Sequence, residues 1–196
     1  MSKNVSSLLH LLFLSLCLVL AVRAVLSAAP NGLAGEQALL DLARATVKAE
    51  VEGKRPPAPP QKSPVRPVFV TIEVKGKVVG CRGGLEPRTQ SLEEEIVLAA
   101  RAAAKHDPRH PPVNPKDLTD LQVTITVVER TEPLDRIESL PASDGLVLRS
   151  GSRVGVVLPW EGKDPKVRLA WARKKAGVPE GAAYRLYRLK AERFRG

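Results

Sequence analysis

The chain has 196 residues, which is enough for one domain of ordinary size or for two small sub-domains that share a core. Apolar residues make up 43 % of it, which excludes a fully disordered chain, and two cysteines exclude a scaffold built on disulfides. The 31 Lys and Arg outnumber the 21 Asp and Glu, so the formal net charge of +10 favours anionic partners.

Residues 1–24 are predicted to be an export signal. Lys3 supplies the positive start, an apolar run extends from Leu8 to Val22, and Val22-Arg23-Ala24 fits the small-x-small cleavage pattern. A cut after Ala29 is the alternative boundary. An uncleaved membrane anchor is the competing interpretation, although the apolar run is short for a span of about 20 residues. Both interpretations place the folded part outside the cytoplasm, as a periplasmic, secreted or anchored domain, with Cys81 as the only thiol after cleavage.

The next segment is predicted to be a helix over residues 36–52. Its apolar positions recur at steps of three and four, and Gly53 is a suitable stop. Residues 55–67 follow as a proline-rich connector, which is expected to be stiff and extended.

Alternating apolar residues predict a strand over 68–74, a turn at 75–77 and a returning strand over 78–81. Ser91 and Glu94 form a capping box that opens a helix, which must end near His106 because Pro108 follows. Residues 106–115 read as a rigid loop, and Asn114-Pro115 opens one short turn.

The second half continues with a strand over 121–127 and a hairpin of 145–148 with 153–158. A helix through Leu169 and Trp171 is expected to end at Gly177, and a last strand covers 187–194. Hairpins mixed with helices predict an α+β fold with a largely antiparallel sheet flanked by helices. No internal repeat is visible in the sequence.

The stretch Gly80-Cys81-Arg82-Gly83-Gly84-Leu85-Glu86-Pro87 resembles the signature of the AMMECR domain family, whose microbial members are called AmmeMemoRadiSam system protein A. The family pattern there is close to Arg-Gly-Cys-Ile-Gly-Thr-Leu-Glu-Pro. The resemblance covers about residues 33–196 and includes other matching stretches: 68–71, 107–113, 144–148, 155–159 and 175–179. The sequence departs from the pattern at Val79, Arg82, Gly84 and His110.

The resemblance implies a sheet flanked by helices, together with a smaller sub-domain. It also implies a possible association with a Memo-type or a radical-SAM protein, but no settled biochemical activity. No cofactor is predicted. An export signal would separate this chain from cytoplasmic radical chemistry.

Cys81 is the candidate catalytic residue, and two interpretations of it stay open. As a thiolate it could act as a nucleophile or redox group, helped by Arg82 and the amides of the glycines. As a small buried residue it would only pack at a strand end. The expected ligand-binding residues around it, for a small molecule or a protein partner, are Gly80, Arg82, Gly83, Gly84, Glu86 and Arg109.

The remaining polar clusters are weaker candidates. His106, Asp107 and His110 fall short of a zinc pattern, so no metal site is predicted, and Asp107 with Arg109 is expected to pin the loop. Glu86 and Arg109 could instead form an ion pair between two loops. The basic C-terminal region could make weak contact with anionic envelope surfaces, as an adaptor would, whereas sparse aromatics argue against nucleic acid.

Overall fold

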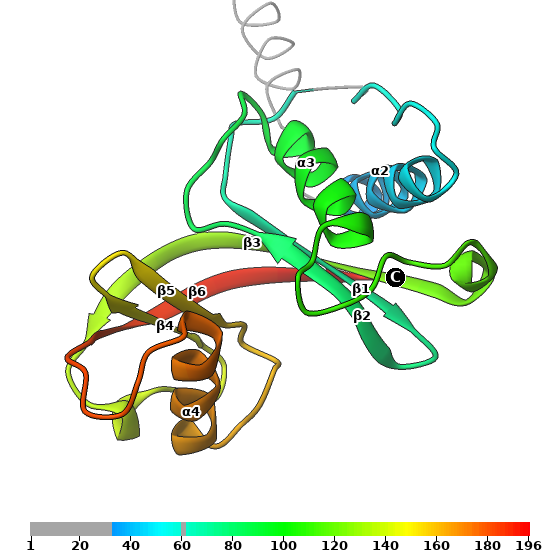
Figure 1. The fold of residues 1–196 in the computed structure, drawn as a ribbon. Coiled ribbons are helices and arrows are strands. Elements are labelled where there is room, and N and C mark those ends of the chain that lie inside the picture. Colours follow the sequence, from blue (N-terminus) through cyan, green and yellow to red (C-terminus); the bar gives the residue numbers. More distant parts are fainter. Residues whose placement is uncertain (1–32, 60–61) are drawn as a thin grey trace, which may run out of the picture. The chain divides into compact units, whose positions relative to one another are not determined.

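The computed structural model describes residues 33–59 and 62–196 (Figure 1). The predicted export signal, with either boundary, lies outside the described residues, as do two residues of the proline-rich connector. Within the described ranges no helix has the length and apolar character needed to cross a membrane. The chain divides into Met1–Glu36 and Gln37–Gly196, and the sheet, its packing and the pocket described below all belong to the second unit.

Six strands form one antiparallel sheet in the order β2-β1-β3-β6-β4-β5. With the helices, this confirms the predicted α+β fold with a largely antiparallel sheet. The strands are β1 Val68–Val74, β2 Lys77–Gly83, β3 Leu121–Leu134, β4 Gly145–Ser150, β5 Arg153–Val157 and β6 Arg185–Arg195. The helices are α2 Leu33–Val51, α3 Leu92–Lys105 and α4 Pro165–Ala176, with short 3-10 turns at Pro115–Asp120 and Ile137–Ser139.

Local capping signals set the ends of α3 and α4. The Ser91 hydroxyl accepts a hydrogen bond from the N–H of Glu94, as the capping box predicts. Asp164 caps α4 by accepting from the N–H of Val167. Gly177 ends that helix in the left-handed region at φ 62°, where a residue without a side chain is favoured.

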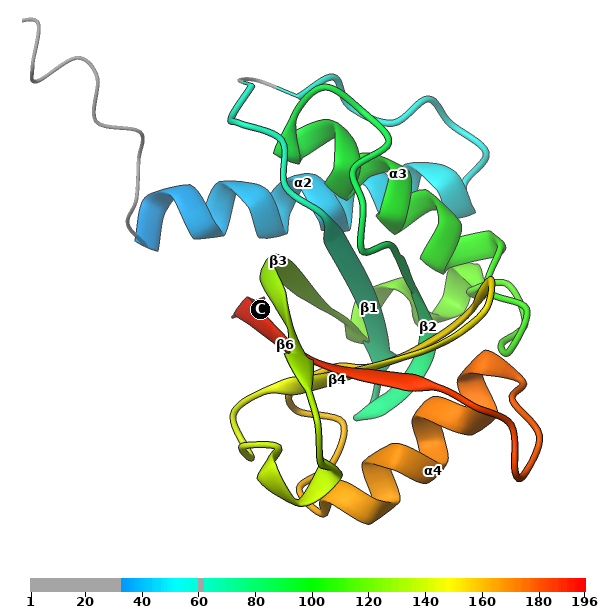
Figure 2. The same cartoon turned by 90° about the vertical axis from the view of Figure 1, so that its left-hand side faces the viewer.

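The fold contains a topological repeat that the sequence does not reveal. In each half a hairpin is followed by a helix and then by a long strand: β1-β2-α3-β3 and β4-β5-α4-β6. The sheet order is symmetric about the β3–β6 pair, which joins the two halves. Figure 2 shows the sheet strongly curled, so that β1 and β2 run across the direction of β4 and β6.

Glycines at matching places let each helix approach its hairpin. A Cβ at Gly80 would lie less than 3.0 Å from the carbonyl of Ala103 in α3, and one at Gly155 would meet the carbonyl of Ala172 in α4 equally closely. Gly83 has the same constraint against the carbonyl of Val68. The strand predicted to end at Cys81 runs on to Gly83, and Gly80 and Gly83 serve close backbone packing.

The two faces of the sheet have different partners. One face packs on the helices, through Ile72 and Ile96 in the first half and through Leu148 and Ala172 in the second. The opposite face carries a smaller apolar cluster: Phe69, Val128, Val147, Leu158 and Leu189, with Cys81, Leu85, Val156, Trp160 and Tyr187 around it. Among the described residues no helix contributes to this cluster, and several of its members, such as Phe69 and Leu158, line the pocket described below.

Two segments differ from their predicted form. β3 continues seven residues beyond the expected end at Val127, because a bulge between Val128 and Arg130 lets it keep pairing with β6. The connector is not only a spacer: the N–H and hydroxyl of Ser63 donate to Glu93 at 2.8 and 2.6 Å, which ties it to the start of α3.

Candidate functional site

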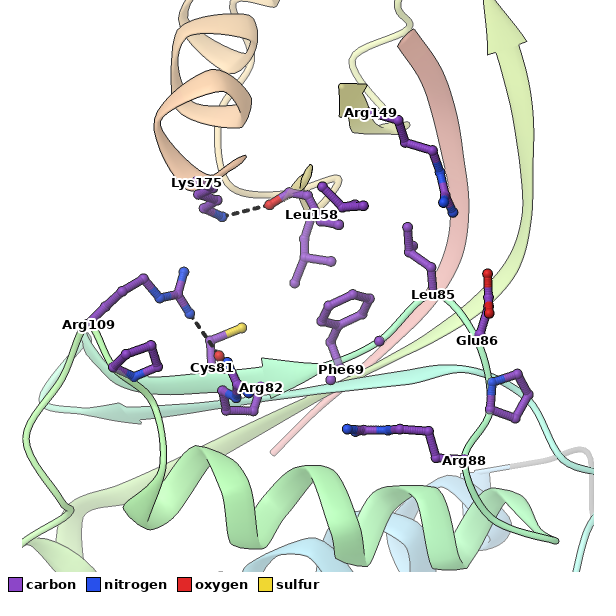
Figure 3. Close-up of a pocket in the computed structure, with 16 residues that line it drawn as sticks. Phe69, Cys81, Arg82, Leu85, Glu86, Arg88, Arg109, Arg149, Leu158 and Lys175 are labelled. Atoms are coloured by element: carbon purple, nitrogen blue, oxygen red, sulfur yellow. Dashed lines mark hydrogen bonds between the residues drawn. The ribbon is translucent and has the colours of Figure 1, made fainter. Parts of the chain in front are cut away.

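A pocket of about 640 Å³ lies where the two halves of the domain face each other (Figure 3). One side of it comes from β2, the segment that follows β2, and the loop at Pro108 and Arg109. The other side comes from β4, β5 and the end of α4. The lining residues are Phe69, Cys81, Arg82, Gly83, Gly84, Leu85, Glu86, Pro87, Arg88, Pro108, Arg109, Arg149, Val154, Val156, Leu158 and Lys175.

Most of the candidate residues from the sequence meet in this pocket. Cys81 and five of the six expected ligand-binding residues line it: Arg82, Gly83, Gly84, Glu86 and Arg109. Gly80 does not, because it packs against α3. The sequence analysis did not predict that Arg149, Val156 and Lys175 line the pocket. Val156 and Lys175 belong to segments that resemble the family, and Arg149 directly follows another such segment.

The outer edge of β2 is held by an ion pair. Asp107 Oδ2 accepts a hydrogen bond from the N–H of Cys81 at 2.8 Å, and Arg109 Nη2 donates to the carbonyl of the same residue at 2.8 Å. The two side chains pair with each other at 2.9 Å, and this confirms that they pin the loop. Among the described residues Glu86 has no ion pair, so the alternative Glu86–Arg109 bridge is not formed.

The environment of Asp107 favours the charged carboxylate. Burial would raise its pKa, but hydrogen bonds from the guanidinium of Arg109 and from the N–H groups of Cys81 and Arg109 outweigh burial and lower the pKa to about 2. The side chain is 1 % exposed, so these bonds are well shielded from water. Asp107 is therefore a structural anchor of the pocket wall and stays ionised at neutral pH.

The outer edge of β5 carries a matching arrangement. Lys175 Nζ donates to the carbonyl of Val156 at 2.9 Å, and Glu161 Oε2 accepts from the N–H of Leu158 at 2.7 Å. Lys175 and Glu161 pair at 2.7 Å. Each half of the repeat thus uses one acid and one base to satisfy backbone groups on an edge strand, and both pairs lie beside the pocket.

The surroundings of Cys81 favour the thiol form. Its Sγ accepts a hydrogen bond from the hydroxyl of Thr71 at 3.2 Å. Burial is the main influence and raises the pKa of the thiol, and the nearby charge of Glu161 adds to this. His106 and His110 do not line the pocket, and in the described part of the chain no three metal-binding side chains gather. This environment disfavours a reactive thiolate.

We therefore expect Cys81 to react with iodoacetamide at pH 7 more slowly than the cysteine of an unstructured peptide, because the thiolate is the reacting form. Mass spectrometry of the labelled protein over time measures the rate. The same protein in denaturant is the control, and it should react at the peptide rate. Faster labelling in the folded state would contradict a raised pKa.

The free charge of the pocket is positive. Arg82, Arg88 and Arg149 line it, and within residues 33–59 and 62–196 none of them forms an ion pair. Glu86 is the one acidic residue of the lining. In Figure 3, Arg149 points toward Leu85 and Glu86, and Phe69 lies beside Leu85. The combination of apolar side chains and unpaired guanidinium groups suits a ligand with an apolar body and an anionic group.

Part of the basic C-terminal region is buried or ion-paired. Arg168 is fully buried and donates to the carbonyl groups of Pro141 and Asp144. Four more basic residues are paired with acids: Lys175 with Glu161, Arg188 with Glu132, Lys190 with Asp144 and Arg195 with Glu73. Arg193 lies over the ring of Trp160 at 4.7 Å. Lys163, Lys166, Lys174 and Arg185 remain exposed, and none of them has an ion pair within residues 33–59 and 62–196.

Comparison with known proteins supports the relationship suggested by the signature. The AMMECR1 family model matches residues 40–196. A protein of Methanothermobacter thermautotrophicus is 35 % identical over 179 residues, covering 80 % of this chain and 91 % of the relative. A protein of Thermotoga maritima is 38 % identical over 132 residues, covering 65 % and 76 %.

A solved structure is similar as well. The crystal structure of an uncharacterised protein from Pyrococcus horikoshii aligns with a TM-score of 0.68 and 27 % identity, covering 79 % of this chain and 88 % of that one. The fold and the sequence therefore lead to the same conclusion: this chain belongs to the AMMECR1 family.

Proposed function

We propose that this domain is a binding module that takes an anionic ligand into the pocket beside Cys81. The observation that carries the proposal is Arg149, which lies on the same face of the sheet as the apolar floor and has no ion pair in the described part of the chain; Arg82 and Arg88 also line the pocket. A guanidinium group is a strong partner for carboxylate and phosphate, and its attraction increases where water is excluded. The pocket volume of about 640 Å³ is in the range of small-ligand sites.

The chemistry of the walls supports binding more than covalent catalysis. Asp107 and Glu161 are both committed to backbone N–H groups and to a basic partner, so neither is free to act as a general base. Burial raises the pKa of the Cys81 thiol, which disfavours the thiolate as a nucleophile at neutral pH. Rigid walls and unpaired cations are the features of a site that holds a ligand in place.

Nuclear magnetic resonance titration of the labelled domain tests this. We expect benzoate, indole-3-acetate and phenyl phosphate to shift signals of pocket residues, whereas benzamide, the neutral counterpart of benzoate, does not. Arg149→Ala should weaken the binding about tenfold, because one charge-assisted contact is lost.

The matched control is Arg136→Ala, a more exposed arginine outside this pocket, which should leave the affinity unchanged. The attraction should also fade at 1 M salt, where the Debye length is about 3 Å. Equal shifts from benzamide, or no shift from any of the anions, would contradict the proposed function.

We also propose that the domain works outside the cytoplasm. Support comes from the sequence alone: Lys3, the apolar run from Leu8 to Val22, and a cleavage pattern that makes Val25 the first mature residue. N-terminal sequencing of the protein from its native envelope tests this, and intact protein in the cytoplasm would contradict it.

A further inference from the structure

Two free sheet edges border the pocket. β2 and β5 are the first and last strands of the sheet order, so each has a neighbour on one side only. In an antiparallel ladder every second residue of an edge strand directs its N–H and C=O groups away from the sheet. Such groups are a template for pairing with another extended chain.

The pairing of β5 with β4 shows which backbone N–H and C=O groups of β5 point away from the sheet. The hairpin pairs Ser150 with Arg153 across a two-residue turn, so that pair is hydrogen-bonded and the next, Arg149 with Val154, is not. The bond from Lys175 to the carbonyl of Val156 agrees with this alternation. Val154 and Val156 therefore point their backbone groups outward, and both residues line the pocket.

The ion pair at β5 leaves a short stretch of this edge open. It occupies the carbonyl of Val156 and the N–H of Leu158. The N–H and C=O of Val154 and the N–H of Val156 remain outward, which is enough for three ladder hydrogen bonds to a short extended segment. Val154 is 37 % exposed, so a chain can approach it from solvent.

The charge beside this stretch points to an acidic occupant. Arg149 is directly opposite Val154 in the hairpin, so its guanidinium flanks the open edge on the same face of the sheet. Arg88 also lines the pocket. Phe69, Leu85 and Leu158 form an apolar surface beside Arg149 (Figure 3). An extended chain alternates its side chains between the two faces of the sheet, so carboxylates at every second position of an added strand lie on the face that carries Arg149.

We propose that the ligand is an extended acidic peptide segment of another protein, which adds to the outer edge of β5 as an extra strand. This inference rests on the proposed function, since it uses the same pocket. Main-chain hydrogen bonds to Val154 and Val156 supply pairing that is independent of the peptide sequence. Arg149 and Arg88 select segments with carboxylates at alternate positions.

Fluorescence polarisation with the intact domain tests the inference. The probe is a pool of labelled hexapeptides that carry glutamate at alternate positions and valine, leucine or threonine between them. A second pool has the same sequences with N-methylated backbone amides, so its charge is kept and its ladder hydrogen bonds are lost. We expect the first pool to bind and the second to bind about tenfold more weakly.

A matched pair of proline variants locates the contact. Val154→Pro removes an outward N–H on β5 and should weaken peptide binding about tenfold. Val78→Pro is the control, because Val78 is also the second residue after a two-residue turn on an edge strand, is 43 % exposed and lies outside the pocket. Thermal unfolding of both variants verifies that they fold.

The outcomes are distinct. Weaker binding with Val154→Pro and with the N-methylated pool, but not with Val78→Pro, supports strand addition at β5. If both pools bind equally and Val154→Pro has no effect, strand addition is overturned while anion binding stands. If benzoate and phenyl phosphate bind but neither pool does, the pocket takes small anions only, which also overturns the inference. If no anionic probe binds, the proposed function fails with it.

Discussion

Replacing Gly155 with alanine is expected to destabilise the domain by roughly 3 kcal/mol or more, at the upper end of what overpacking costs. The added Cβ would lie less than 3.0 Å from the carbonyl of Ala172, which is backbone and cannot rotate away. Relief requires α4 to move off the sheet, and that would open the apolar contacts of Leu146, Leu148 and Ala172. Urea unfolding followed by circular dichroism measures the loss.

Gly84→Ala is the control for that experiment. A Cβ at Gly84 would have its nearest neighbour, the carbonyl of Glu86, at 3.4 Å, which is ordinary contact, so the free energy of unfolding should change by less than about 0.5 kcal/mol. Gly80→Ala, the equivalent change in the other half, should behave like Gly155→Ala. A Gly155→Ala variant as stable as the parent would mean that α4 does not pack as closely as described.

Asp107→Ala is expected to cost roughly 3 kcal/mol in the free energy of unfolding, because the N–H of Cys81 and the guanidinium of Arg109 lose their partner. The carboxylate accepts bonds from both, and from the N–H of Arg109. Asp135→Ala, at an exposed site without an ion pair in the described part of the chain, is the control and should be nearly neutral.

Asp107 also makes stability depend on pH. Its pKa is about 2 in the folded protein against an ordinary 3.8, so the folded state binds the proton less readily than the unfolded state. The stabilisation is present above pH 3.8 and is lost as the pH falls towards 2. After allowing for screening by solvent, it amounts to roughly 1–2 kcal/mol. Urea midpoints between pH 6 and pH 2 should fall more steeply for the parent than for Asp107→Asn.

The elements that the sequence predicted well carry their own local signals. The capping residues of α3, the glycine that ends α4 and the alternating residues of β1 all act within a few positions of the chain. β3 was predicted too short because the apolar alternation ends at Val127, and the bulge between Val128 and Arg130 is not visible in the sequence. Pairing with β6, which is distant in sequence, overrides that local signal.

The site was predicted in part for the same reason. The signature placed Cys81, Arg82 and Glu86 at the pocket, because they are neighbours in sequence. Arg149 and Lys175 reach it only through the curl of the sheet and the approach of α4, which no local pattern encodes. Arg168 illustrates a second limit: it lies in the basic C-terminal region, and no local pattern shows that it is fully buried.

The symmetric order of the sheet has a consequence for how the chain folds. Within each half the hairpin and its helix are close in sequence, so they can form rapidly from local contacts. The β3–β6 pair joins residues as far apart as Thr124 and Arg195, so closing that loop is entropically the costly step. We therefore expect two preformed halves to precede a slow joining event, and ligand binding to appear only with the last kinetic phase of refolding.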